Sequence, residues 1–179
     1  MKRLCSLPLS LLVIFLAFFT TRWVYSQADT RVRVSPAQVT LQPGKSAAIE
    51  IWVDDVDALF AFEADIHFDP GLISAKDLTP GGFLEPGQEA INLIDNDNGS
   101  IQYHMTQWGQ NVTSKSGSGV LFSFEITLLD ATAGSDIEIE HILLSDRDSF
   151  EIPCVVQHGV VISPGSGPEF SVYLPLILH

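Results

Sequence analysis

Hydrophobic and polar residues alternate along much of the chain, most clearly over residues 59–70, LFAFEADIHFDP. Every second residue from Phe60 to Phe68 is apolar. Successive side chains of an extended strand point to opposite sides, so this pattern predicts a strand with one row in the core. The other row consists of Leu59, Ala61, Glu63, Asp65 and His67.

Similar alternation recurs in short segments that turn residues separate. The predicted strands cover residues 31–35, 47–53, 59–70, 72–78, 90–94, 100–107, 120–129, 136–144 and 155–163. A Ser/Gly-rich loop is expected before residue 120, and no segment has a helical period over three turns. About nine short strands in one domain predict an all-β fold, a β-sandwich with jelly-roll or Greek-key connections.

The two ends of the chain differ from this pattern. Lys2 and Arg3 precede an apolar run over residues 7–19, and Ser26-Gln27-Ala28 offers a cleavage site after Ala28. These features predict a signal peptide over 1–28 and a secreted or cell-surface protein; an uncleaved membrane anchor is the alternative. The domain then covers 29–163, followed by a Pro/Gly/Ser linker over 164–171. The apolar tail over 172–179 is too short to span a membrane, and its role stays open.

Charge and cysteine content narrow the function classes. The full chain has a formal net charge of −13, and loss of Lys2, Arg3 and Arg22 with the signal peptide makes it −16. Such acidity argues against nucleic acid and anionic lipid as partners. Cys154 is the only cysteine after cleavage, so no internal disulfide can form. Its apolar neighbours favour a packed side chain over a nucleophile.

Glu63, Asp65 and His67 have the side-chain types of a metal or catalytic site. Same-face neighbours on one strand lie ~7 Å apart, so three in a row span too far for one ion. A full site would need ligands from an adjoining strand, with His104 and Glu125 as candidates. Since no catalytic motif accompanies them, we predict no enzyme activity, no metal and no cofactor in this domain.

Residues 95–99, DNDNG, resemble a calcium-binding loop. The EF-hand spacing fails, because Ile94 and Met105 occupy the positions that need acidic ligands. Asn98-Gly99 between two alternating segments instead predicts a type I′ hairpin turn. Other calcium geometries, including ones with Asp146 and Asp148, stay open.

Aromatic residues suggest direct carbohydrate binding as an alternative function. Trp52 is out of phase with its apolar neighbours and is expected outside, whereas Tyr103 and Trp108 lie in or just beyond the segment 100–107. A planar row of exposed aromatic rings stacks on sugar rings. Partly buried edge aromatics are the other interpretation of each residue alone.

Several short motifs also follow one another in a particular order. They are VRVSP at 32–36, QPG at 42–44, FEADIHFDPGL at 62–72, GSI at 99–101, GVLFSF at 119–124, LSD at 144–146 and GVVI at 159–162. This succession resembles the cohesin domain over about residues 31–163. The resemblance implies a nine-stranded antiparallel β-sandwich with jelly-roll topology and no catalytic activity. Its expected partner is a dockerin, a calcium-loaded module carried by polysaccharide-degrading enzymes and other secreted proteins.

The resemblance also implies where the dockerin binds, since cohesins use one sheet face for this purpose. Carried onto this chain, the expected contact residues come from three strands: Ala61, Glu63, Asp65 and His67; Gln102, His104 and Thr106; and Leu121, Ser123, Glu125 and Thr127. The chain departs from the family at Ala61 and Glu63, where many cohesins have asparagine. This departure leaves the dockerin class open.

Overall fold

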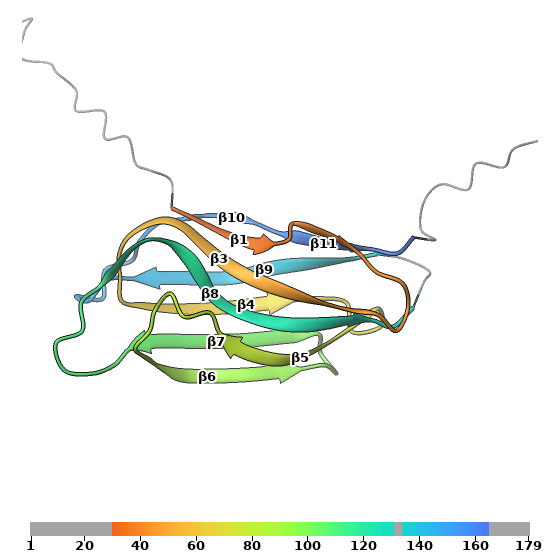
Figure 1. Cartoon of the computed structure of the whole chain (residues 1–179), viewed down its shortest axis with the longest axis horizontal. Coiled ribbons are helices and arrows are strands. Elements are labelled where there is room, and N and C mark those ends of the chain that lie inside the picture. The colour runs from red at the N-terminus through yellow and green to blue at the C-terminus, as the bar shows by residue number, and fades with distance from the viewer. Residues whose placement is uncertain (1–29, 131–133, 165–179) are drawn as a thin grey trace, which may run out of the picture.

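Two β-sheets packed face to face make up the part of the chain that the structure describes, residues 30–130 and 134–164 (Figure 1). The structure is a computed structural model. The predicted signal peptide, the apolar tail and the linker after Pro164 lie outside the described residues. Among the described residues, no helix is long and apolar enough to cross a membrane.

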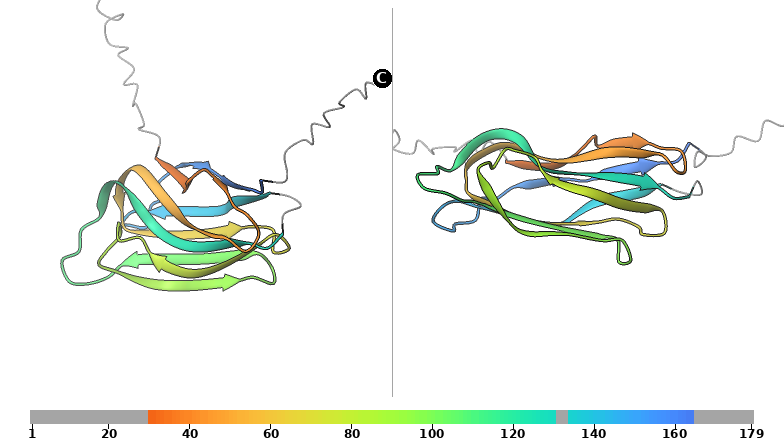
Figure 2. Two further views of the ribbon diagram at one scale, coloured as in Figure 1. Left: turned by 45° about the vertical axis from the view of Figure 1, so that its right-hand side comes forward. Right: turned by 60° about the horizontal axis from the view of Figure 1, so that its bottom comes forward.

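The first sheet has five strands in the order β10-β1-β3-β8-β5. Their bounds are Val155–Gln157 for β10, Arg31–Ser35 for β1, Ser46–Leu59 for β3, Lys115–Leu128 for β8 and Ile73–Pro80 for β5. The second sheet has six strands in the order β2-β11-β9-β4-β7-β6. Their bounds are Gln38–Thr40 for β2, Gly159–Ile162 for β11, Ser135–Ser145 for β9, Ala61–His67 for β4, Ser100–Gln107 for β7 and Gly87–Asp95 for β6. Figure 2 shows the two layers from further directions.

This arrangement confirms the predicted all-β sandwich with jelly-roll topology, although the described residues form eleven strands rather than nine. The chain crosses repeatedly between the two sheets, including between β1 and β2 and between β10 and β11. The two additional strands are β2, which no predicted strand covers, and one of the pair β10 and β11, into which the predicted strand 155–163 is divided. β1 pairs with β10 and β2 with β11 in parallel, so the sheets are mixed, not wholly antiparallel as expected.

The apolar row of alternating side chains on β4 fills the centre of the core, as predicted. Phe62, Ala64 and Ile66 are at most 1% exposed. The rings of Tyr103 and Phe122 stack with their centroids 4.9 Å apart, which joins β7 of one sheet to β8 of the other. Phe60 was expected in the core, but it lies between β3 and β4 and is only half-buried, with the Arg147 guanidinium 5.6 Å from its ring centroid.

The predicted Ser/Gly-rich loop before residue 120 is instead the beginning of β8. It pairs with the second half of β3, where two interruptions of the register lie. Asp55 and Ala58 there have φ of 54° and 57°. Their backbone N–H groups donate to the hydroxyls of Ser118 and Ser116, at 2.9 and 3.0 Å. These serine side chains therefore bridge the two strands where the regular ladder is interrupted.

The β6–β7 hairpin is confirmed, but its turn covers four residues, 96–99, and is not of type I′. That turn requires positive φ at two residues, and here only Gly99 has it, at 67°. The Asp95 carboxylate accepts the backbone N–H groups of Asp97 and Asn98, both at 3.0 Å, and thereby closes a longer loop. Among the described residues no group of three or more His, Cys, Asp or Glu side chains is placed to hold a metal ion.

Asn96 in this turn joins the two sheets. Its side-chain oxygen accepts the backbone N–H of Ala75 at 2.7 Å, and its amide nitrogen donates to the Ala75 carbonyl at 3.0 Å. Ala75 belongs to β5, the edge strand of the first sheet. The side chain thus occupies the place of one residue of a further strand.

We expect Asn96→Ala to lower the free energy of unfolding by about 1–2 kcal/mol, because two partly buried backbone groups lose their partner. Urea unfolding followed by circular dichroism measures the change. Asp97→Ala is the matched control, since its carboxylate makes no hydrogen bond or ion pair within the described residues, and we expect a change within about 0.5 kcal/mol. Equal losses for the two variants would show that the bridge to Ala75 contributes nothing.

Candidate partner-binding face

The outward side chains of four adjacent strands lie in register on one surface. β4 pairs with β9 on one side and with β7 on the other, and β7 pairs with β6. We call this surface the β4 face. In the order β9, β4, β7, β6, its rows are Ser145-Ala61-Thr106-Gln88, Leu143-Glu63-His104-Ile91, His141-Asp65-Gln102-Leu93 and Glu138-His67-Ser100-Asp95.

The structure brings together all the residues that sequence reasoning selected on β4 and β7. Each is exposed or half-exposed and points away from the core; they are Ala61, Glu63, Asp65, His67, Gln102, His104 and Thr106. Their common position agrees with the expectation. Their role in binding a partner stays a prediction.

The residues selected on β8 do not belong to this face, so the expectation of one continuous surface was wrong. β8 lies in the five-stranded sheet, and Ser123, Glu125 and Thr127 point outward on the opposite side of the sandwich. Leu121 is fully buried at an irregularity of the register. Alternation shows which side chains of β8 are outward, but it does not show which sheet contains the strand.

β9 and β6 take the place of β8 on the β4 face, and they add apolar side chains that sequence reasoning missed. Ile91 and Leu93 on the edge strand β6 are 36% and 50% exposed. Leu143 on β9 is half-exposed. The segments 90–94 and 136–144 were recognised as strands, but only their pairing with β7 and β4 reveals that these side chains adjoin Glu63 and His104.

The polar groups of the β4 face have few partners within the protein. His104 Nε2 lies 3.4 Å from Asp65 Oδ1. Glu63, His67 and Glu138 form no hydrogen bond or ion pair through their side chains with other described residues. Most of the hydrogen-bonding capacity of this surface is therefore available to a partner.

The outer face of the five-stranded sheet differs in this respect, because its polar side chains bind one another across the strands. Ser46 and Thr127 hydroxyls lie 2.8 Å apart, Thr79 and Ser123 hydroxyls lie 3.0 Å apart, and Lys76 Nζ lies 2.9 Å from Glu125 Oε1. The Lys76 ammonium lowers the pKa of Glu125 through a hydrogen bond. Side chains of this sheet face thus form hydrogen bonds and an ion pair with one another, so fewer of their polar groups are available to a partner.

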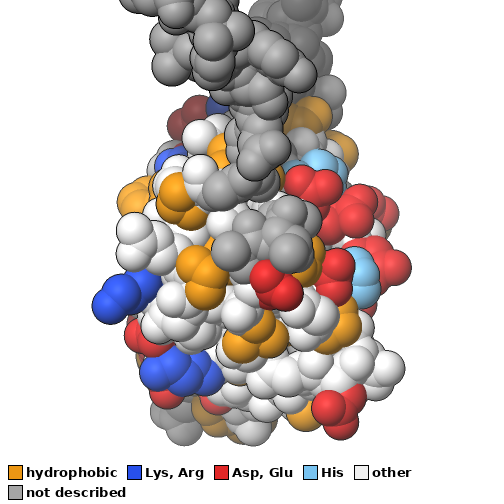
Figure 3. All heavy atoms as spheres, turned by 90° about the vertical axis from the view of Figure 1, so that its right-hand side faces the viewer, with side chains coloured by type: hydrophobic (Ala, Val, Ile, Leu, Met, Phe, Trp, Pro, Cys, Tyr) orange, Lys and Arg blue, Asp and Glu red, His pale blue; other side chains and the backbone are white. Residues whose placement is uncertain are grey.

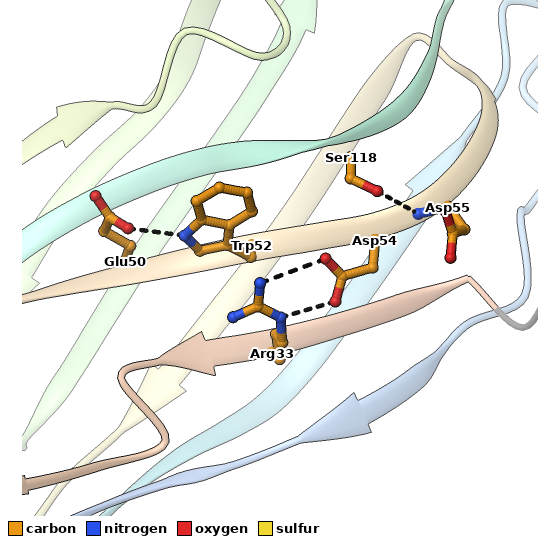
Figure 4. Close-up of polar contacts among 6 residues, drawn as sticks. All are labelled: Arg33, Glu50, Trp52, Asp54, Asp55 and Ser118. Carbon is orange, nitrogen blue, oxygen red and sulfur yellow. Dashed lines mark hydrogen bonds and ion pairs between the residues drawn. The ribbon is translucent and has the colours of Figure 1, made fainter.

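Arg33 and Trp52 extend that network (Figure 4). The Trp52 indole N–H donates to Glu50 Oε2 at 2.7 Å, and the Arg33 guanidinium lies 5.0 Å from the Trp52 ring centroid. Arg33 in turn donates to Asp54 Oδ2 at 2.7 Å. Trp52 does point outward as predicted, but Arg33 occupies one face of its ring.

The three aromatic residues proposed for sugar stacking do not form a planar row. Tyr103 has no exposed surface, and its hydroxyl donates to Glu89 Oε1. Trp52 lies on the outer face of the other sheet, while Trp108 is 68% exposed in the loop after β7. The prediction was wrong for Tyr103, because its place in β7 is in phase with the buried residues Ile101 and Met105.

A hollow of about 460 Å³ opens where β4 ends and β9 begins. Its lining includes His67 and Glu138 of the β4 face, together with Asp69 and Asp136. Asp69 is engaged locally, since its carboxylate accepts the N–H of Gly71 at 2.8 Å. Cys154, the other residue considered for chemistry, is half-buried, and burial raises the pKa of its thiol, which fits packing rather than reactivity.

Comparison with solved structures identifies the fold. A non-cellulosomal cohesin from the archaeon Archaeoglobus fulgidus aligns with a TM-score of 0.63 and 13% sequence identity, covering 76% of this chain and 91% of that one. A type II cohesin from Acetivibrio cellulolyticus aligns with a TM-score of 0.64 and 13% identity, covering 74% and 95%. A type I cohesin from Clostridium thermocellum, solved in complex with a dockerin, aligns with a TM-score of 0.63 and 15% identity, covering 75% and 99%.

The sandwich therefore has the cohesin fold, as the order of motifs in the sequence indicated. No protein-family model matches the chain, and no curated protein sequence matches it significantly. The similarity lies in the arrangement of strands and not in residue identity.

Tyr103 gives a test of the core beneath the β4 face. Burial, and then the hydrogen bond to Glu89, raise the pKa of Tyr103 above its ordinary value. The unfolded chain releases this proton at about pH 10, while the folded chain keeps it. This contribution to stability is therefore complete below that pH and declines above it. We expect Tyr103→Phe to lose less stability than the unmodified protein between pH 9 and pH 11, measured by urea unfolding.

Lys76 also has a raised pKa, but it is present in both proteins and so cancels from the comparison. Parallel losses of stability for the two proteins would contradict a proton retained on Tyr103.

Proposed function

We propose that this chain is a secreted, non-catalytic receptor module that binds a dockerin-bearing protein through the β4 face, in association with extracellular polysaccharide breakdown. The observation that carries the proposal is the contrast between the two outer faces. Polar side chains satisfy one another on the five-stranded sheet, whereas the β4 face combines free polar groups with exposed Ile91 and Leu93. Charged and apolar groups without partners on one surface are typical of a binding site.

Solved relatives of this fold support the choice of partner. A Clostridium thermocellum cohesin and an Acetivibrio cellulolyticus cohesin were each crystallised in complex with a dockerin. In this chain the partner would contact the four rows of the β4 face. The apolar side chains would supply the desolvated contacts, and Glu63, His67 and Gln102 would supply oriented hydrogen bonds.

Export belongs to the same proposal. The charged start, the apolar run over residues 7–19 and the cleavage site after Ala28 support it. Expression in a secreting host followed by N-terminal sequencing tests it, with Asp29 as the expected first residue. A protein that keeps residues 1–28 in the membrane fraction would favour the alternative of an uncleaved anchor.

Removing the exposed apolar pair tests the proposed face. We expect Ile91→Ser with Leu93→Ser to weaken binding of calcium-loaded dockerin modules at least about tenfold, because each side chain would lose a desolvated contact worth about 1 kcal/mol. Glu63→Ala with His67→Ala should also weaken binding. Titration calorimetry against a panel of type I and type II dockerins measures both effects, and chelation of calcium from the dockerin should abolish binding.

The matched control is Ser123→Ala with Thr127→Ala on the opposite face, for which we expect unchanged affinity. Loss of binding in this control variant, with none in the β6 variant, would transfer the site to the five-stranded sheet. Circular dichroism of every variant excludes unfolding as the cause.

Direct polysaccharide binding is the second candidate function, and the exposure of Trp108 supports it. This indole is 68% exposed and lines a hollow with Gly109 and Gln110. If no dockerin binds and the protein sediments with cellulose or xylan, this alternative replaces the first. Trp108→Ala should then abolish sedimentation, while Trp52→Ala, whose ring Arg33 already covers, should have a smaller effect.

A further inference from the structure

Charged side chains are divided unevenly between the two sheets. Arg31, Arg33, Lys76 and Lys115 lie on strands of the five-stranded sheet. No Lys or Arg lies on a strand of the six-stranded sheet. The six strands carry seven acidic residues: Glu63, Asp65, Glu89, Asp95, Asp136, Glu138 and Glu140. In the end view of Figure 3, Asp and Glu side chains gather on one side of the molecule and Lys and Arg on the other.

Most of these carboxylates are available to a partner. Glu89 accepts the Tyr103 hydroxyl, and Asp95 accepts N–H groups of its hairpin. The remaining five are exposed or half-exposed, and only Asp65 has a side-chain partner in the described residues, His104. On the five-stranded sheet three acids form ion pairs with cations: Asp54 with Arg33, and Asp77 and Glu125 with Lys76.

We infer that the partner surface that docks on the β4 face is cationic and presents Lys or Arg side chains within reach of Glu63 and Glu138. The inference rests on the proposed function and specifies the chemistry of the partner. A surface with several unpaired acids and no cation attracts positive charge and repels acidic proteins before contact. Ile91 and Leu93 are exposed on the edge strand β6. The partner surface therefore also needs apolar side chains opposite β6, next to its Lys or Arg side chains.

An NMR titration that needs no dockerin tests the inference. The probes are a lysine-rich amphipathic peptide and its twin with every lysine replaced by glutamate, added to the ¹⁵N-labelled protein. We expect the lysine peptide to shift amide signals of β4, β7 and β9, with affinity falling about tenfold between 20 and 200 mM NaCl because added salt screens the attraction. The glutamate peptide should shift none of these signals.

Glu63→Gln with Glu138→Gln should weaken binding of the lysine peptide severalfold. Asp55→Asn with Asp77→Asn removes the same charge from the five-stranded sheet and should leave binding unchanged; both residues have positive φ, which asparagine tolerates. Equal effects of the two double variants, or shifts that map to the five-stranded sheet, would overturn the inference.

A dockerin panel separates this inference from the proposed function. Dockerin modules are compared with variants in which Lys and Arg are replaced by glutamine. If the affinity is unchanged by these replacements, the proposed function is supported and a cationic partner surface is contradicted. If no dockerin binds but the lysine peptide shifts signals of the β4 face, the proposed function is contradicted. The inference that this face binds a cationic partner is then supported.

Discussion

The alternation of β4 between buried and exposed side chains is the constraint on which the rest of the structure depends. Phe62, Ala64 and Ile66 are enclosed between the sheets, and a slip of one residue would place Glu63 and Asp65 in the core instead. Burying carboxylates without partners costs several kcal/mol each, so the register of this strand is strongly determined. Because β7 and β9 both pair with β4, their outward rows follow from the same constraint.

The two sheets share one core but use their outer faces differently. On the five-stranded sheet, short polar side chains and opposite charges meet across strands and stabilise the sheet itself. On the β4 face, acids and histidines share the rows with leucine and isoleucine, and few of them bind one another. One sheet thus contributes to stability on both of its sides, which leaves the other free to carry side chains that serve a partner.

Local pattern was enough to predict the faces of individual strands but not the neighbours of those strands. The outward rows of β4 and β7 are neighbours in one sheet, as the resemblance implied, whereas β8 was grouped with them although it lies in the other sheet. The pairing of β4 with β9 brings Glu63 beside Leu143, which follows from the closure of the whole sandwich and has no local signal. Tyr103 is different, since its phase with Ile101 and Met105 did indicate burial.

The edge strand β6 shows how an exposed apolar strand remains compatible with a stable domain. Its outer edge has no neighbouring strand among the described residues, and Ile91 and Leu93 are exposed beside it. Such an edge invites pairing with other chains. The register of β6 with β7 is interrupted between Glu89 and Ile91, where Ala90 is the extra residue, and a bulge of this kind bends the strand and disturbs the ladder that a further strand would extend. The edge therefore offers its side chains more readily than its backbone, which suits a partner that docks on the face of the sheet rather than one that adds a strand to it.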